Sequence, residues 1–81
     1  MYQIKRGDEV IAICGKDTVI HTIMNLLNGK AEELDIQHLS LSLSYRDLAM
    51  KSDVRVDPTP FLIKMDIQPI AAKYNLTITE E

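Results

Sequence analysis

The sequence predicts a small α+β domain with a mixed, mainly antiparallel sheet, one main amphipathic helix over about residues 17–28, and one or two short helices. Three patterns support this fold class: alternation of apolar and polar residues in several short segments, a helical apolar period after residue 18, and glycine or proline between segments. The expected order of elements is β-β-α-β-(α)-β-α-β. Because the chain has 81 residues, we expect a single domain over residues 1–81.

The first segment is typical of a β-hairpin. Tyr2 and Ile4 alternate with polar residues, and Gly7-Asp8 places glycine first in a two-residue connection, as a type II′ turn requires. The segment 10–14 that follows is apolar on both faces and rich in β-branched residues. We therefore expect an interior strand there, flanked by other strands or covered on both sides.

The main helix is expected after Gly15-Lys16. Asp17 is a suitable N-cap residue, and Gly29 suits the position just beyond the last turn. The apolar residues between them recur at helical spacing and form one face: Val19, Ile20, Ile23, Met24, Leu26 and Leu27. We expect this face to cover one side of the sheet. The centre of the core is expected at Ile13, Ile23, Leu27, Leu41 and Ile63.

A stripe of leucines and serines occupies the middle of the chain. The leucines at 39, 41 and 43 alternate with Ser40, Ser42 and Ser44. Alternation at period two predicts a strand over roughly 36–44, with an irregularity near His38 and the leucines in the core. The serine face is either an ordinary exposed face or a smooth surface for a second sheet, a subunit or a partner. Ser40, Ser42 and Ser44 are therefore candidate binding residues, and we expect a symmetric homodimer formed through a sheet surface or edge.

The C-terminal half predicts shorter elements. Ser44-Tyr45-Arg46-Asp47 resembles a capping box and indicates a short helix through about residue 51. Apolar residues alternate over 61–67, which favours a strand, while Thr59-Pro60 before them favours a helix as the alternative. A short helix over 68–74 and a last strand over 76–79 are expected next.

Charge and hydropathy argue against several classes of partner. Nine basic and twelve acidic residues give a net charge of −3 without a basic stripe, so we expect no nucleic-acid partner. No apolar window approaches the ~18 residues of a membrane span, so we expect no membrane insertion. Cys14 is the single cysteine and cannot form an intrachain disulfide, and the first residues do not resemble a signal peptide. We expect a cytoplasmic location.

Residues that could carry catalysis or bind a metal are few and scattered. Cys14 comes at the end of an expected strand and His21 lies on the next helix, the arrangement of a thiol nucleophile and its base. A free cysteine is more often a small buried apolar residue, so we expect Cys14 to be buried and inert. Cys14, His21 and His38 lack the spacing of metal ligands, so we expect no metal and no cofactor.

The sequence therefore favours a protein that acts by contact without catalysis. We expect a protein-binding or assembly module such as an adaptor, an inhibitor or an accessory subunit, for example of a mobile element, with a protein as its partner. One alternative is a small-ligand-binding protein whose pocket forms between subunits. A second alternative is an enzyme that uses Cys14 and His21.

Overall fold

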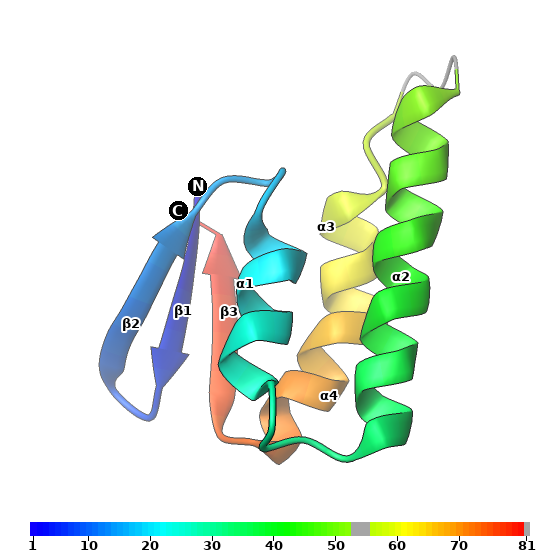
Figure 1. Cartoon of the computed structure of the whole chain (residues 1–81). Coiled ribbons are helices and arrows are strands. Elements are labelled where there is room, and N and C mark those ends of the chain that lie inside the picture. The colour runs from blue at the N-terminus through cyan, green and yellow to red at the C-terminus, as the bar shows by residue number, and fades with distance from the viewer. Residues whose placement is uncertain (53–55, 81) are drawn as a thin grey trace.

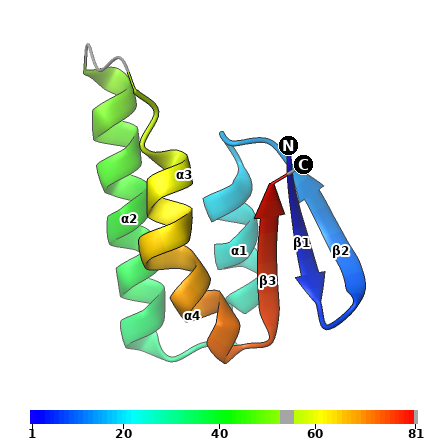
Figure 2. The ribbon, with the colours of Figure 1, turned by 180° about the vertical axis from the view of Figure 1, so that it is seen from behind.

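The fold is an antiparallel sheet with its helices on one side. A computed structural model describes residues 1–52 and 56–80 of the chain. Its three-stranded sheet has the order β2-β1-β3, and the helices all lie on the same side of it (Figure 1; Figure 2). The α+β class and the antiparallel sheet are confirmed, whereas two of the expected strands are helices.

The elements follow the order β-β-α-α, then a helical segment in three parts, then β. Their bounds are β1 (Tyr2–Arg6), β2 (Glu9–Cys14), α1 (Val19–Leu27), α2 (Glu33–Lys51), α3 (Thr59–Leu62), the π-helical segment η1 (Ile63–Ile67), α4 (Gln68–Lys73) and β3 (Leu76–Glu80). In both views α2 lies farthest from the sheet, with the α3–η1–α4 segment along it (Figure 1; Figure 2). The helical part is therefore two layers deep over one face of the sheet.

The predicted hairpin is confirmed, but the expected interior strand over 10–14 is wrong. Gly7 has a φ of +62°, which a glycine-first turn requires. The central strand is β1, because it pairs with β2 on one side and with β3 on the other. β2 is therefore an edge strand, its Val10 and Ile13 side chains are exposed, and Ile11 forms a bulge opposite β1.

Helix α1 lies within the predicted range and buries one face. The buried side chains are Val19, Ile20, Ile23 and Leu27. Gly29 follows the helix with a φ of +77°, a conformation that glycine adopts without strain. Asp17 does not cap the helix, because Thr18 occupies the N-cap position, and the Asp17 carboxylate instead accepts a hydrogen bond from Arg46.

The predicted strand over 36–44 is wrong, because these residues lie inside the 19-residue helix α2. Side chains two residues apart point in different directions on a helix, so the leucines at 39, 41 and 43 do not lie on one face. Leu39 is fully buried and Leu43 is half-buried, whereas Leu41 is 70% exposed. The short helix expected from Ser44 is the C-terminal part of the same helix.

The predicted strand over 61–67 is also wrong, and the alternative of a helix beginning at Thr59-Pro60 is confirmed. In η1 the Gln68 N–H donates to the carbonyl five residues earlier, which is the π-helical pattern. Pro69 supplies the physical reason. It has no N–H to donate, and in an α-helix its ring would clash with the Met65 carbonyl, so a wider turn accommodates it.

The predicted last helix and strand are confirmed as α4 and β3. Between them Asn75 has a φ of +62°, which asparagine tolerates better than most residues. β3 pairs with β1, and the Gln68 side chain lies against the backbone of β3. Its Nε2 donates to the Leu76 carbonyl at 3.1 Å and its Oε1 accepts from the Ile78 N–H at 2.7 Å.

The core lies between the inner face of the sheet and the helices. Its fully buried large side chains are Ile4, Val19, Ile20, Ile23, Leu39, Thr59, Ile67 and Leu76. Of the expected core residues, Ile23, Leu27 and Ile63 are buried, whereas Ile13 and Leu41 are exposed. Cys14 is buried, as predicted.

Two leucines of α2 provide a test of this packing. Leu39→Ala removes a fully buried side chain and should lower the free energy of unfolding by about 2–5 kcal/mol. Leu41→Ala removes an exposed side chain and should change it by less than about 0.5 kcal/mol. Urea denaturation followed by circular dichroism measures both values at one low protein concentration. Equal losses for the two variants would contradict the orientation of α2.

Candidate functional site

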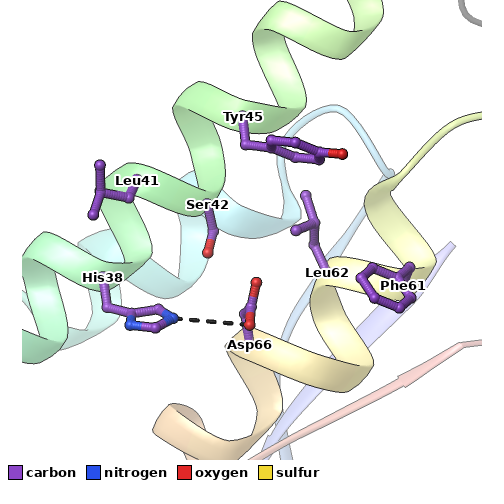
Figure 3. A pocket seen from close by; sticks show the side chains of 7 residues that line it. All are labelled: His38, Leu41, Ser42, Tyr45, Phe61, Leu62 and Asp66. Carbon is purple, nitrogen blue, oxygen red and sulfur yellow. Dashed lines mark ion pairs between the residues drawn. The ribbon is translucent and has the colours of Figure 1, made fainter.

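A groove runs between α2 and the segment formed by α3 and η1. It encloses about 300 Å³. Its lining residues are His38, Leu41, Ser42 and Tyr45 from α2, and Phe61, Leu62 and Asp66 from the opposite wall (Figure 3). Most of this lining is apolar, which is the character of a surface that binds side chains or small molecules.

The α2 wall belongs to a longer exposed row, which we call the α2 seam: Leu34, His38, Leu41, Tyr45 and Leu48. Successive members stand four or three residues apart, so they form one stripe along the helix. Leu34 is 74% exposed and Leu48 is 67% exposed, and Tyr45 is also exposed. The opposite side of α2 buries Leu39, so this helix presents apolar residues in two directions.

The opposite wall adds two further large apolar side chains. Phe61 and Met65 stand four residues apart on α3 and η1, and both are exposed. Leu62 forms the buried base of this wall. Phe61 and Leu62 line the groove opposite Leu41 and Tyr45 of the α2 seam.

A polar pair lies at one end of the groove. Nε2 of His38 is 3.8 Å from Oδ1 of Asp66, and Figure 3 shows the two side chains facing each other. The Ser42 hydroxyl points into the groove near Asp66 in the same view. These groups give the apolar groove a polar end that can orient whatever binds there.

The geometry of His38, Ser42 and Asp66 does not form a nucleophile with its base. Such a pair needs donor and acceptor within about 2.6–3.2 Å, and the base must lie between the nucleophile and the carboxylate. Here the carboxylate of Asp66 faces both other groups, and no hydrogen bond of Ser42 is found among the described residues. The polar end of the groove therefore fits recognition better than acyl transfer.

The candidate serines do not lie on one strand face. Because they belong to α2, Ser42 is buried beside the groove, while Ser40 and Ser44 are exposed. The sheet surface expected to carry them is therefore wrong. Contact of the three serines with a partner stays a prediction. Of the three, Ser42 is the one that lines the groove.

The structure places Cys14 and His21 in different surroundings. Cys14 is buried at the end of β2, whereas His21 is exposed on α1. Among residues 1–52 and 56–80, no hydrogen bond joins the two, and no group of three or more His, Cys, Asp or Glu is placed to hold a metal ion. Within the same residues, no helix has the length and apolar character needed to cross a membrane.

A buried arginine holds the two walls of the groove in place. Arg46 on α2 is only 7% exposed. Its Nε donates to the Thr59 hydroxyl at 2.7 Å, and its Nη2 donates to the Asp17 carboxylate at 2.6 Å. Arg46 therefore joins α2 to the start of α3 and to the loop before α1.

The network continues from Thr59 to Asp57. The Thr59 N–H and hydroxyl both donate to Oδ1 of Asp57, at 2.9 and 2.6 Å. Oδ2 of Asp57 is buried without a hydrogen-bond partner, and the Lys16 ammonium lies 3.4 Å away as an ion pair. Burial raises the pKa of the Asp57 carboxyl, but the bonds from Thr59 and the Lys16 charge lower it by more, so the net pKa lies below its ordinary value.

A second polar cluster joins the start of α2 to the end of α4. The Tyr74 hydroxyl donates to Asp35 at 2.6 Å and accepts from the Glu32 N–H at 3.0 Å, and the Lys73 ammonium donates to Asp35 at 3.2 Å. The bond from Tyr74 and that from Lys73 lower the pKa of the Asp35 carboxyl below its ordinary value. The same bonds raise the pKa of Lys73 and of Tyr74.

Most residues of the groove were missed by sequence reasoning. Leucine recurs at 34, 41 and 48, every seven residues, and this spacing fits a helix and not a strand. That signal extends on both sides of the leucine–serine stripe and was available in the sequence. Phe61 and Asp66 carried no comparable signal, because their position depends on where α3 packs.

Comparison of the chain with protein-family models, with curated proteins and with solved structures found no match.

The Arg46 network can be tested at Thr59. Thr59→Val keeps the shape but removes the hydroxyl that accepts from Arg46 and donates to Asp57, leaving buried polar atoms without a partner. We expect the free energy of unfolding to fall by about 1–3 kcal/mol. Thr77→Val, at an exposed position of β3, is the control and should change it by less than about 0.5 kcal/mol. An unchanged Thr59→Val protein in urea denaturation would contradict the role of the network.

The Asp35 cluster predicts a loss of stability in acid. A depressed carboxyl pKa stabilises the folded state above the unfolded pKa of about 3.9, and this contribution is lost as pH falls through the lower folded value. Tyr74→Phe removes one of the bonds, so its Tm should be lower at neutral pH and should fall less than that of the parent below about pH 4. Thr79→Val, at an exposed position of β3, is the control. Parallel Tm curves for parent and Tyr74→Phe would rule this contribution out.

Proposed function

We propose that this chain is a protein-binding module that contacts its partner through the α2 seam and the groove beside it. The observation that carries the proposal is the exposed apolar surface of α2, α3 and η1, formed by Leu34, Leu41, Tyr45, Leu48, Phe61 and Met65. Single exposed apolar residues need no explanation, but several large ones gathered on neighbouring helices support an interaction site.

The size of this surface supports the proposal. At roughly 100 Å² or more for each exposed side chain, it offers on the order of 600–800 Å² of apolar area. The largest apolar patch of a typical monomer is about 300–600 Å², and a standard interface buries about 800 Å² per partner. The surface is therefore large enough to serve as the core of an interface.

The shape of the surface indicates the mode of binding. Two helical walls enclose the groove, and Tyr45 and Phe61 stand at its rim (Figure 3). An amphipathic helix laid along such walls places its side chains between them at helical spacing. His38 and Asp66 at the polar end supply hydrogen-bonding groups that fix its direction.

Other parts of the proposal come from the sequence. The single cysteine supports a cytoplasmic site of action, and the net charge of −3 without a basic stripe supports a partner other than nucleic acid. Ligand binding between subunits is the alternative function, and the 300 Å³ groove lies at the small end of ligand pockets.

Site-specific photo-crosslinking in the cells that produce the protein tests the proposal. p-Benzoylphenylalanine in place of Tyr45 or Phe61 lies on the proposed surface, and the same residue in place of Thr77 is the control on exposed β3. We expect covalent protein adducts from positions 45 and 61 and none from position 77. Adducts at all three positions alike, or at none, would reject the α2 seam as the binding surface.

A further inference from the structure

We propose that the partner of the α2 seam is a second copy of this chain, bound with the two α2 helices antiparallel and the two-fold axis near Leu41. This inference rests on the proposed function and names its partner. The spacing of the seam, its charges, its area and its polar end all favour a second copy.

The spacing of the seam is that of helix pairs that pack along their length. Leu34, Leu41 and Leu48 repeat every seven residues, and His38 and Tyr45 fall four residues after the first two. This is the alternation of a and d positions by which two helices interlock side chains. The seam is thus a helix-binding surface, and α2 is itself a helix with a matching seam.

The position of the leucines makes the seam complementary to itself. Leu41 stands midway between Leu34 and Leu48. A two-fold axis at Leu41, perpendicular to α2, therefore places Leu34 of each copy opposite Leu48 of the other. Such an isologous contact closes as a dimer and leaves no repeated surface for further addition.

The charges beside the seam favour the antiparallel arrangement. Glu33 and Lys51 lie at the two ends of α2, about five helical turns apart, and therefore flank the seam on the same side. Antiparallel helices bring Glu33 of each copy towards Lys51 of the other, and their helix dipoles also oppose each other favourably. In a parallel pair, Glu33 of one copy and Lys51 of the other stay about five helical turns apart, so this pairing of opposite charges does not form.

The area matches what a dimer needs. The seam with Phe61 and Met65 offers on the order of 600–800 Å² per copy, close to the ~800 Å² per partner of a standard interface. The second copy brings an equal apolar surface, so both are removed from water by one contact. A chain of 81 residues has a thin core, and association adds to its stability.

The polar end of the groove fits a residue of the second copy. With the axis at Leu41, Tyr45 of the second copy lies at the level of His38. Its ring then covers the mouth of the groove, and its hydroxyl reaches the His38 and Asp66 side chains. A tyrosine places its ring on apolar atoms and its hydroxyl on polar ones, as this groove requires.

The sheet is a poorer surface for a second copy. The outer edge of β2 carries the bulge at Ile11, which disturbs further strand pairing. On the other edge, the Gln68 side chain already bonds to β3. Val10 and Ile13 are the large apolar side chains that the described strands expose, and they offer far less area than the seam.

The first test measures association of the purified chain. Analytical ultracentrifugation over a dilution series should show the parent at twice its monomer mass of 9.2 kDa and dissociating at low concentration. Leu41→Glu should raise the dimer dissociation constant by at least about thirtyfold. Ile13→Glu, exposed on β2, is the control and should leave the constant unchanged.

The second test fixes the direction of the helices by disulfide trapping. Under oxidation Leu41→Cys should crosslink to itself, while Leu34→Cys should not, because its two copies stand about 20 Å apart along the helices. A mixture of Leu34→Cys and Leu48→Cys should crosslink. The parent, whose Cys14 is buried, is the control.

Three outcomes overturn the inference. They are a parent that is monomeric at every concentration, a dimer that Ile13→Glu dissociates and Leu41→Glu leaves intact, and self-crosslinking of Leu34→Cys. If the parent is monomeric but photo-crosslinking at Tyr45 yields adducts with another protein, the second copy is wrong and the proposed function stands. If the parent is monomeric and no adduct forms, both the second copy as partner and the proposed function are rejected.

Discussion

The buried guanidinium of Arg46 is the interaction on which the packing of the helices depends. Burying a cation lowers the stability of the folded state unless its N–H groups make hydrogen bonds. Asp17 and Thr59, which accept hydrogen bonds from Arg46, must therefore remain beside it. Asp17 precedes α1 and Thr59 begins α3, which fixes both helices relative to α2. Tyr45 adjoins Arg46 in the chain and Phe61 follows two residues after Thr59, so the same bonds set the separation of the groove walls.

The elements that sequence reasoning predicted well are those with a single apolar face or a marked turn. The hairpin at Gly7, the helix over 19–27 and the last strand all have such signals. The prediction for α2 was wrong because this helix carries apolar residues on two faces, one with Leu39 and one with Leu41. Its apolar residues therefore do not follow a single helical period, and over 39–44 they alternate with serines as in a strand. The prediction for residues 61–67 was wrong because the π-helical turn before Pro69 changes the spacing of the apolar residues from that of an α-helix.

The candidate site was harder to predict than the fold. Only Ser42 of the candidate binding residues lines the groove, and it does so from a helix and not from a strand. A groove between elements distant in sequence depends on long-range packing, here on the contact of Arg46 with Thr59. Sequence spacing could have revealed the α2 wall through its seven-residue repeat, but it gives no means of placing Phe61 opposite Tyr45.

The order of the strands in the sheet governs when the fold can form. The central strand, β1, is made first, and its second neighbour, β3, comes last, with every helix between them. During synthesis the hairpin and α1 therefore emerge before the strand that completes the sheet. Until residues 76–80 are available, one edge of β1 and the apolar side of α1 remain open to other chains. Pairing of β1 with β3 is a contact of long sequence separation, and contacts of this kind slow folding.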